Sequence, residues 1–241
     1  MSKQKRYQKP NNQQNDTFIK PLLLKNSAQE YYVETMKEST VTFCLGPAGT
    51  GKTYLATYVA LEMLLKGEVD KIVLTRPLVA TEEIGFLPGD FDQKIAPYLM
   101  PLKDAIEDHV GFTKSKQLFE DGKFEVLPLA YMRGRSLNRC VMLLDEGQNC
   151  TKEQMKMFLT RIGYNSKIIV TGDTAQSDLK GDQQNGMEWA CEKLKGATGE
   201  ISVVEFSSKN IVRNPLIEKI LRQLDGPSIN RSIDDTRRRS R

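Results

Sequence analysis

Six short runs of mostly apolar residues recur along the chain, and segments with helical periodicity separate most of them. Short apolar runs bounded by turn residues are typical of buried strands, whereas apolar residues spaced three and four apart are typical of amphipathic helices. This alternation predicts an α/β domain with a mainly parallel sheet and helices on both faces. The predicted strands are residues 41–45, 71–75, 124–127, 140–144, 167–171 and 201–206.

The first predicted helix opens at Asn26 and runs to about Lys37. Asn26 and Gln29 have the spacing of an N-terminal capping pair. The Gln29 amide also offers one donor and one acceptor, which is the pair that an adenine edge requires. Local spacing alone favours the cap.

The last predicted helix begins at Asn214-Pro215, with Asn at the cap and Pro at the first helical position. Arg213 comes directly before this rigid start, which would hold its guanidinium firmly in a nucleotide site. An arginine at such a place is also compatible with a plain surface position.

Two prolines, Pro97 and Pro101, interrupt the region after the second strand, so turns are expected there before a helix from about Leu102 to His109. His109 is the only histidine, and it stands in a charged run beside Glu107 and Asp108. This setting predicts an exposed side chain. A single histidine also argues against a histidine-based metal site.

Charge and composition divide the chain into a body and two tails. Residues 1–20 carry five basic side chains against one acidic, and residues 226–241 carry five against two, within a total net charge of +4. We expect a disordered basic tail over residues 1–20, one domain over 21–226 and a basic tail over 227–241. Basic tails attract nucleic acid, or they serve solubility alone.

The compartment predicted from the sequence is the cytoplasm. The polar N-terminus has no hydrophobic segment typical of a secretory signal. The four cysteines show no metal-ligand spacing, so they are expected to be reduced and mostly buried.

The clearest motif joins the first strand to a helix. It is a full phosphate-binding loop, in which glycines and a helix N-terminus surround an anion with backbone N–H groups. Lys52 would reach the β- and γ-phosphates of a nucleotide, and the Thr53 hydroxyl would sit on Mg²⁺. The motif reads Gly46-Pro47-Ala48-Gly49-Thr50-Gly51-Lys52-Thr53.

Acidic residues follow the strand at 140–144, whose uniformly apolar sequence is typical of a central parallel strand. Asp145 is placed to hold the Mg²⁺ shell, and Glu146 is placed to polarise a water against the γ-phosphate. Gln176 or Asp173, after the next strand, is a candidate contact to the γ-phosphate or the attacking water.

A pair of arginines, Arg133 and Arg135, flanks Gly134 in the loop before that acidic strand. They are equally compatible with a phosphate contact, a solvated turn or a contact with a neighbouring subunit.

Taken in order, these motifs resemble those of the PhoH-like family of P-loop ATPases, over about residues 26–223. The resemblance implies a single RecA-like domain similar to the first motor domain of superfamily-1 helicases, of the short type found in bacteria and bacteriophages. The matching segments include Gly46-Pro47-Ala48-Gly49-Thr50-Gly51-Lys52-Thr53-Tyr54-Leu55, Thr75-Arg76-Pro77, Gly85-Phe86-Leu87-Pro88-Gly89, Asp145-Glu146-Gly147-Gln148-Asn149, Thr171-Gly172-Asp173 with Gln176, and Val212-Arg213-Asn214-Pro215.

The same resemblance implies roles for individual residues. Gln29 becomes an adenine contact, Tyr54 joins the nucleotide-binding segment, Gln176 becomes a γ-phosphate sensor and Arg213 a candidate arginine finger. Gly147 departs from the alanine usual in the family, and we expect it to loosen the strand end. Asn214 and residues 80–83 depart from the pattern as well.

The function implied is Mg²⁺-dependent ATP hydrolysis coupled to RNA or single-stranded DNA, with RNA unwinding as a possible outcome. One alternative is a nucleotide-gated binding module with slow hydrolysis. Another is a P-loop kinase. A kinase must exclude water from its site, whereas the adjacent carboxylates Asp145 and Glu146 favour hydrolysis by water.

The predicted assembly is a ring, a hexamer. About 200 structured residues leave no room for a second motor domain to cover the γ-phosphate. A head-to-tail ring supplies that cover. Arg213, or alternatively Arg133 or Arg135, would then reach the ATP of the next subunit.

Overall fold

The computed structural model describes residues 18–77, 91–179 and 185–212, together with residues 216, 217, 220 and 223; side chains at 91–99 lie outside the description. By its contacts the chain divides into two units, Met1–Ile211 and Val212–Arg241. In the second unit, Leu216, Ile217, Ile220 and Gln223 are helical, in agreement with the predicted last helix. The first unit contains the six strands of the sheet.

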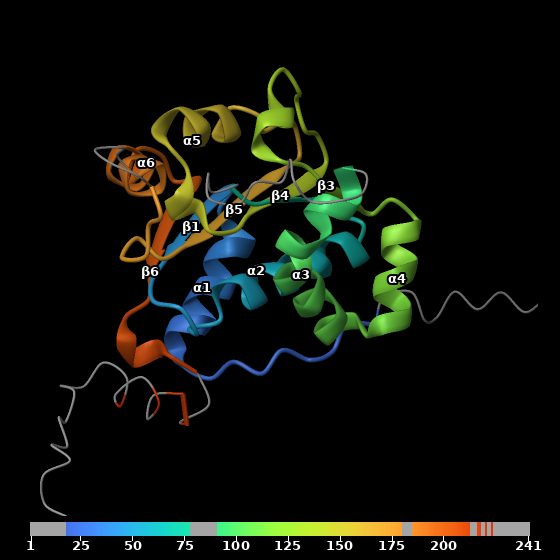
Figure 1. The fold of residues 1–241 in the computed structure, drawn as a ribbon, viewed down its shortest axis with the longest axis horizontal. Helices are drawn as coiled ribbons and strands as arrows, with labels where there is room; N and C mark the ends of the chain where they lie inside the picture. Colours follow the sequence, from blue (N-terminus) through green and yellow to red (C-terminus); the bar gives the residue numbers. More distant parts are fainter. Residues whose placement is uncertain are drawn as a thin grey trace, which may run out of the picture. The chain divides into compact units, whose positions relative to one another are not determined.

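Its centre is a six-stranded sheet in which every described strand pair is parallel, as predicted. The strand order is β3-β2-β4-β5-β1-β6 (Figure 1). The central position of β4 explains its apolar sequence, since both of its faces are covered. The strands are β1 (Val41–Leu45), β2 (Lys71–Thr75), β3 (Phe124–Val126), β4 (Cys140–Leu144), β5 (Lys167–Gly172) and β6 (Ile201–Glu205).

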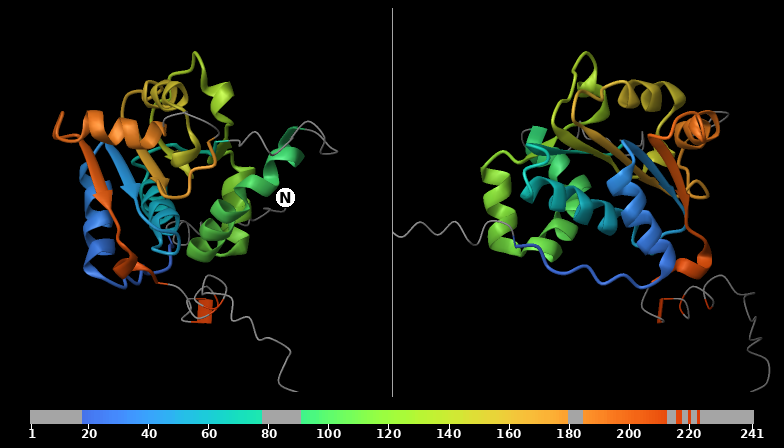
Figure 2. Two further views of the ribbon diagram at one scale, coloured as in Figure 1. Left: turned by 60° about the vertical axis from the view of Figure 1, so that its left-hand side comes forward. Right: turned by 180° about the vertical axis from the view of Figure 1, so that it is seen from behind.

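Helices cover both faces of this sheet, which confirms the predicted architecture (Figures 1 and 2). Side chains alternate along each strand, so Cys44 packs with one helical layer and Phe43 with the other. One layer contains α1 (Ser27–Glu38), α2 (Lys52–Leu65), α3 (Phe91–Val110) and α4 (Phe112–Glu120). The opposite layer contains α5 (Lys152–Leu159), α6 (Gly186–Leu194) and the 3₁₀ turn η2 (Leu129–Met132); two further turns are η3 (Gly147–Asn149) and η4 (Ser208–Asn210).

Side-chain caps mark the first residues of α1 and α5. The Asn26 side chain accepts the backbone N–H of Gln29 at 3.0 Å, which confirms the predicted cap of α1. Thr151 and Gln154 form both bonds of a capping box at the start of α5. These caps set the first residues of the two helices, which pack on opposite faces of the sheet.

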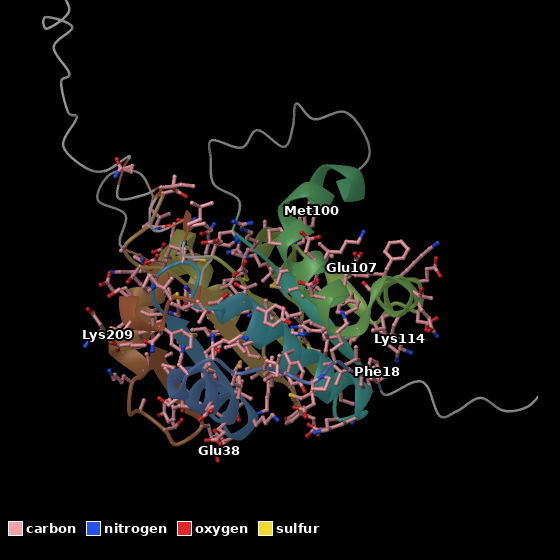
Figure 3. All side chains as sticks on the ribbon, turned by 90° about the horizontal axis from the view of Figure 1, so that it is seen from below. Phe18, Glu38, Met100, Glu107, Lys114 and Lys209 are labelled. Carbon is pink, nitrogen blue, oxygen red and sulfur yellow. The ribbon has the colours of Figure 1, made fainter. Side chains whose placement is uncertain are left out.

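The prediction for α3 was wrong in two respects. The helix is continuous through Pro97 and Pro101, although each proline removes one N–H donor and its ring crowds the carbonyl group one turn earlier. His109 is 1% exposed rather than at the surface. It shares the inner face of the helix with Leu102 and Ile106, while the neighbouring Glu107 is on the outer part of α3 (Figure 3). Helical periodicity therefore overrides the charged run.

A buried histidine gives the fold a pH dependence. Burial lowers the pKa of His109, while its bond to Tyr54 O and the charge of Asp108 oppose the shift and Lys20 adds to it. The unfolded chain therefore binds more protons than the native one below the ordinary value of 6.5, so the free energy of unfolding falls as pH drops from 7 to 5.

Urea unfolding across that pH range measures this effect. His109→Gln, which does not titrate, is expected to flatten the decline. An unchanged slope in the variant would show that other groups carry the pH dependence.

The start of the described chain contacts the body. The Lys20 N–H donates to His109 O at 2.9 Å, and Ile19 packs against the core. Ile19 and Lys20, which were predicted to belong to the basic tail, therefore contact the folded body. All four cysteines are free and buried, and burial raises the pKa of Cys150 and Cys191 to about 12. Within the described ranges, no helix is long and apolar enough to cross a bilayer.

Candidate nucleotide-binding site

The phosphate loop links β1 to α2 and needs glycine at its first position. Gly46 has φ of +148°, and a Cβ there would lie 2.6 Å from the carbonyl oxygen of Phe206. Only glycine fits so close to a backbone. Farther along the loop, the Thr50 hydroxyl donates to Pro47 O at 3.0 Å. The loop is thus held by its own groups, with the N-terminus of α2 behind it.

Lys52 opens α2 and folds back over the loop. Its Nζ donates to Gly46 O at 2.6 Å and to Pro47 O at 2.9 Å, and the residue is 8% exposed. Burial lowers the pKa of Lys52, while Cys44 and the nearby carboxylates oppose that shift. A cation held over a ring of backbone N–H groups is the arrangement that binds a polyphosphate.

Asp145, at the end of β4, meets two hydroxyl groups. Its Oδ1 accepts from Thr53 Oγ1 at 2.7 Å and from Thr171 Oγ1 at 2.6 Å. Carboxylate and hydroxyl oxygens are the donors that Mg²⁺ prefers, so Asp145 and Thr53 fit this ion. No role for Thr171 was predicted from the sequence. The feature that could have indicated a role is its hydroxyl group near the carboxyl end of β5, the strand that pairs with β4.

Glu146 adopts a left-handed conformation, with φ of 56°, which turns it out of the strand direction. Arg76 Nη2 donates to its Oε1 at 3.3 Å, and Gln148 Nε2 donates to its Oε2. Gln148 is 2% exposed, and its Oε1 accepts the N–H of Asp173 at 3.0 Å. Asp173 Oδ2 in turn accepts the N–H of Ala48 at 3.2 Å. Side chains from three strand ends are thereby linked to the phosphate loop.

These residues surround a cavity of about 470 Å³ at the carboxyl ends of the strands. Ligands bind at this edge in open α/β sheets. One wall comes from α3, which the sequence analysis did not connect with the site. The lining residues are Ala48, Gly49, Gly51, Lys52, Thr53, Tyr54, Arg76, Pro101, Asp104, Ala105, Asp108, Asp145, Glu146, Gly172, Asp173 and Gln176.

Several predicted site residues thus gather in one place, while Arg133 and Arg135 do not join them. Tyr54 and Gln176 line the cavity. Arg135 instead pairs with Glu125 of β3 at 2.7 Å, and neither it nor Arg133 lines the cavity. Arg213 lies outside the described residues.

Gln29 lies behind the loop with its amide fully engaged. Its Nε2 donates to Thr50 O at 2.9 Å, and its Oε1 accepts the N–H of Lys25 at 2.8 Å. The residue is 3% exposed. In this conformation Gln29 supports the phosphate loop, and an adenine contact would require both bonds to be exchanged.

Gly147 is a close-packing position rather than a loose strand end. A Cβ there would lie 2.7 Å from Val170 Cγ1 and 3.3 Å from Met187 Sδ. Gly147→Ala is therefore expected to lower the free energy of unfolding by about 1–3 kcal/mol through overpacking. Urea denaturation measures the loss.

Gly199 provides the matched control, because nothing lies within 4 Å of a Cβ added there. Adding Val170→Ala to the Gly147 variant should relieve part of the loss. Equal stability of the Gly147→Ala and Gly199→Ala proteins would mean that Val170 shifts without cost.

A phosphate loop with a buried lysine, and a parallel strand delivering Asp145 beside Thr53, define a P-loop NTPase domain. The family model described as PhoH-like protein matches residues 21–225. The chain belongs to the PhoH-like family.

Curated relatives agree with this assignment. A PhoH-like protein of Bacillus subtilis is 49% identical over 207 residues, covering 86% of this chain and 65% of the relative. Protein PhoH of Escherichia coli K12 is 40% identical over 204 residues, covering 83% and 57%. The chain therefore spans less than two thirds of the length of these relatives.

Solved structures show a more distant similarity. Pif1 helicase from Candida albicans matches 83% of this chain and 44% of its own, with 14% identity and a TM-score of 0.41. A Bacteroides Pif1 bound to single-stranded DNA matches 84% and 46%, with 13% identity and a TM-score of 0.35.

Proposed function

We propose that this protein hydrolyses ATP with Mg²⁺. The observation that carries the proposal is the convergence of Lys52, Thr53, Asp145, Glu146 and Gln176 on one cavity of about 470 Å³. Thr53 and Asp145 would hold Mg²⁺, which neutralises phosphate charge when bound. Lys52 would bind the β- and γ-phosphates, and Gln176 would contact the terminal one.

In the chemical step, the oxygen of a water molecule attacks the γ-phosphorus. Glu146 orients this water by accepting a hydrogen bond from it. A bond forms between that oxygen and phosphorus, and the bond from phosphorus to the β–γ bridging oxygen breaks. The products are ADP and inorganic phosphate; one proton of the water stays on the phosphate, and the other passes through Glu146 to solvent or to the phosphate. Hydrogen bonds from Glu146 through Gln148 and Asp173 to Ala48 hold the Glu146 carboxylate in a fixed position relative to the phosphate loop.

We further propose that RNA or single-stranded DNA stimulates this hydrolysis. The support is the basic charge of residues 1–20 and 226–241, which favours a polyanion. Phosphate release measured with Mg²⁺, with and without RNA and single-stranded DNA, tests both proposals. Hydrolysis that is absent in all conditions would refute the ATPase. Hydrolysis that no polynucleotide changes would restrict the function to a nucleotide-gated module.

The buried free cysteines support a cytoplasmic location.

The active assembly is proposed to be a head-to-tail ring, a hexamer, with an arginine from one subunit reaching the next. Arg213 is the first candidate, ahead of Arg133 and Arg135. Mixing Lys52→Ala protein with Arg213→Ala protein tests this, because a mixed ring contains intact composite sites and should regain activity. Light scattering with ATP and Mg²⁺ measures the oligomeric state. A protein that is monomeric under these conditions and still hydrolyses ATP at the full rate would refute the ring.

A further inference from the structure

Arg76 and Glu146 lie just beyond the carboxyl ends of the neighbouring strands β2 and β4. Thr75 of β2 pairs with Leu144 of β4, and the N–H of Asp145 donates to Thr75 O at 3.1 Å. Arg76 follows Thr75 directly, and Glu146 is the second residue after Leu144. The backbone therefore presents a guanidinium and a carboxylate side by side, with 3.3 Å between Arg76 Nη2 and Glu146 Oε1.

Arg76 also lines the cavity that contains Lys52 and Thr53. Among the described residues that line it, Arg76 is the arginine. A guanidinium presents a planar fork of N–H groups that binds phosphate oxygens as readily as carboxylate oxygens. With 29% of its side chain exposed, Arg76 is accessible to a ligand entering the cavity.

The observed contacts conflict with the role proposed for Glu146. Both of its oxygens accept hydrogen bonds from protein cations or amides, Oε1 from Arg76 and Oε2 from Gln148. A carboxylate oxygen that faces a guanidinium is a poorer acceptor for a water molecule, because the positive charge competes for its lone pairs. Glu146 therefore polarises a water more strongly once Arg76 gives up Oε1.

We propose that Arg76 is a catalytic arginine acting in cis, which exchanges Glu146 for the γ-phosphate of bound ATP. The exchange places a second cation, besides Lys52, on the phosphoryl group during hydrolysis. It also leaves Glu146 Oε1 to accept from the attacking water. Gln148 keeps its bond to Oε2, so the carboxylate stays oriented while one oxygen changes partner. This inference rests on the proposed ATPase function.

The test compares Arg76→Ala and Arg76→Lys with wild type, using full-length protein. ATP and ADP affinities are measured by calorimetry with Mg²⁺, on the Glu146→Gln background to prevent turnover, and hydrolysis is measured on the wild-type background. Arg76→Ala is expected to weaken ATP about 10- to 100-fold while ADP changes little, since ADP lacks the γ-phosphate. Turnover is expected to fall by about 10²–10³-fold, and Arg76→Lys should recover part of both.

Arg139 gives a matched control on the same two strands. It comes directly before β4 and pairs with Asp70, directly before β2, at 2.7 and 2.9 Å. Arg139→Ala thus removes an equivalent strand-bridging ion pair at the opposite end of β2 and β4, away from the cavity. It is expected to leave the ATP-to-ADP affinity ratio and turnover at wild-type values.

Two results would overturn the inference. One is an unchanged ATP-to-ADP ratio with unchanged or faster turnover in Arg76→Ala, which would make Arg76 a simple restraint on Glu146. The other is unchanged nucleotide affinity with loss of polynucleotide stimulation alone, which would make Arg76 a nucleic-acid contact. Failure of the ATPase proposal would look different, because wild type itself would then show no hydrolysis that depends on Lys52.

Discussion

Lys52→Ala is expected to weaken ATP binding by about 100-fold or more and to reduce hydrolysis to background. The lysine is 8% exposed and lies over the phosphate loop, so its charge acts where water screens it little. Its loss removes the cation that is proposed to contact both the β- and the γ-phosphate. Calorimetry with ATP and Mg²⁺ measures the binding, and phosphate release measures the turnover.

Folding must be checked in the same variant, because Lys52 also donates to Gly46 O and Pro47 O. The loss of these bonds is expected to cost stability by about 1–2 kcal/mol, partly offset by removal of a buried charge. A folded Lys52→Ala protein that binds ATP as tightly as wild type would refute the site. Lys167→Ala is a suitable comparison, since Lys167 is another partly buried lysine bonded to backbone carbonyl oxygens and lies outside the cavity.

Local patterns were sufficient to predict the sheet and most helices. An apolar run such as β4 reports burial on both faces, and the capping residues Asn26 and Thr151 report where helices start. Local reasoning failed in α3, where neighbouring charges suggested exposure for His109. Its burial depends on packing against Tyr54 and Tyr58 of α2, with ring centroids 4.1 and 5.3 Å away. Such contacts between distant segments have no local signature.

The candidate site shows the same division. Lys52, Thr53, Asp145 and Glu146 belong to motifs that each occupy a few consecutive residues, so spacing alone singled them out. The contributions of Arg76, Thr171 and the α3 wall depend on how the strands are arranged in space. β2 lies beside β4 although β3 separates the two in the sequence, and β5 lies on the other side of β4. Gln29 shows a third case, in which the motif identified the residue and the fold engages its amide in support of the loop.

Glu146→Gln is expected to retain ATP binding while hydrolysis falls by about 10²–10⁴-fold. The amide has nearly the same shape, and its oxygen can still accept from Arg76 or Gln148, so the network to Asp173 should persist. What is lost is the negative charge that draws a proton from the attacking water. Single-turnover phosphate release, compared with calorimetric ATP affinity, separates the two effects.

Glu125→Gln is the matched control for this change. Glu125 also pairs with an arginine, Arg135, at 2.7 Å, and it lies on β3 outside the cavity, so its variant is expected to hydrolyse at the wild-type rate. A Glu146→Gln protein with wild-type turnover would reject Glu146 as the group that orients the water. Loss of ATP affinity equal to the loss of turnover would instead mean that Glu146 acts in ground-state binding, since a group needed only for the chemical step leaves affinity unchanged.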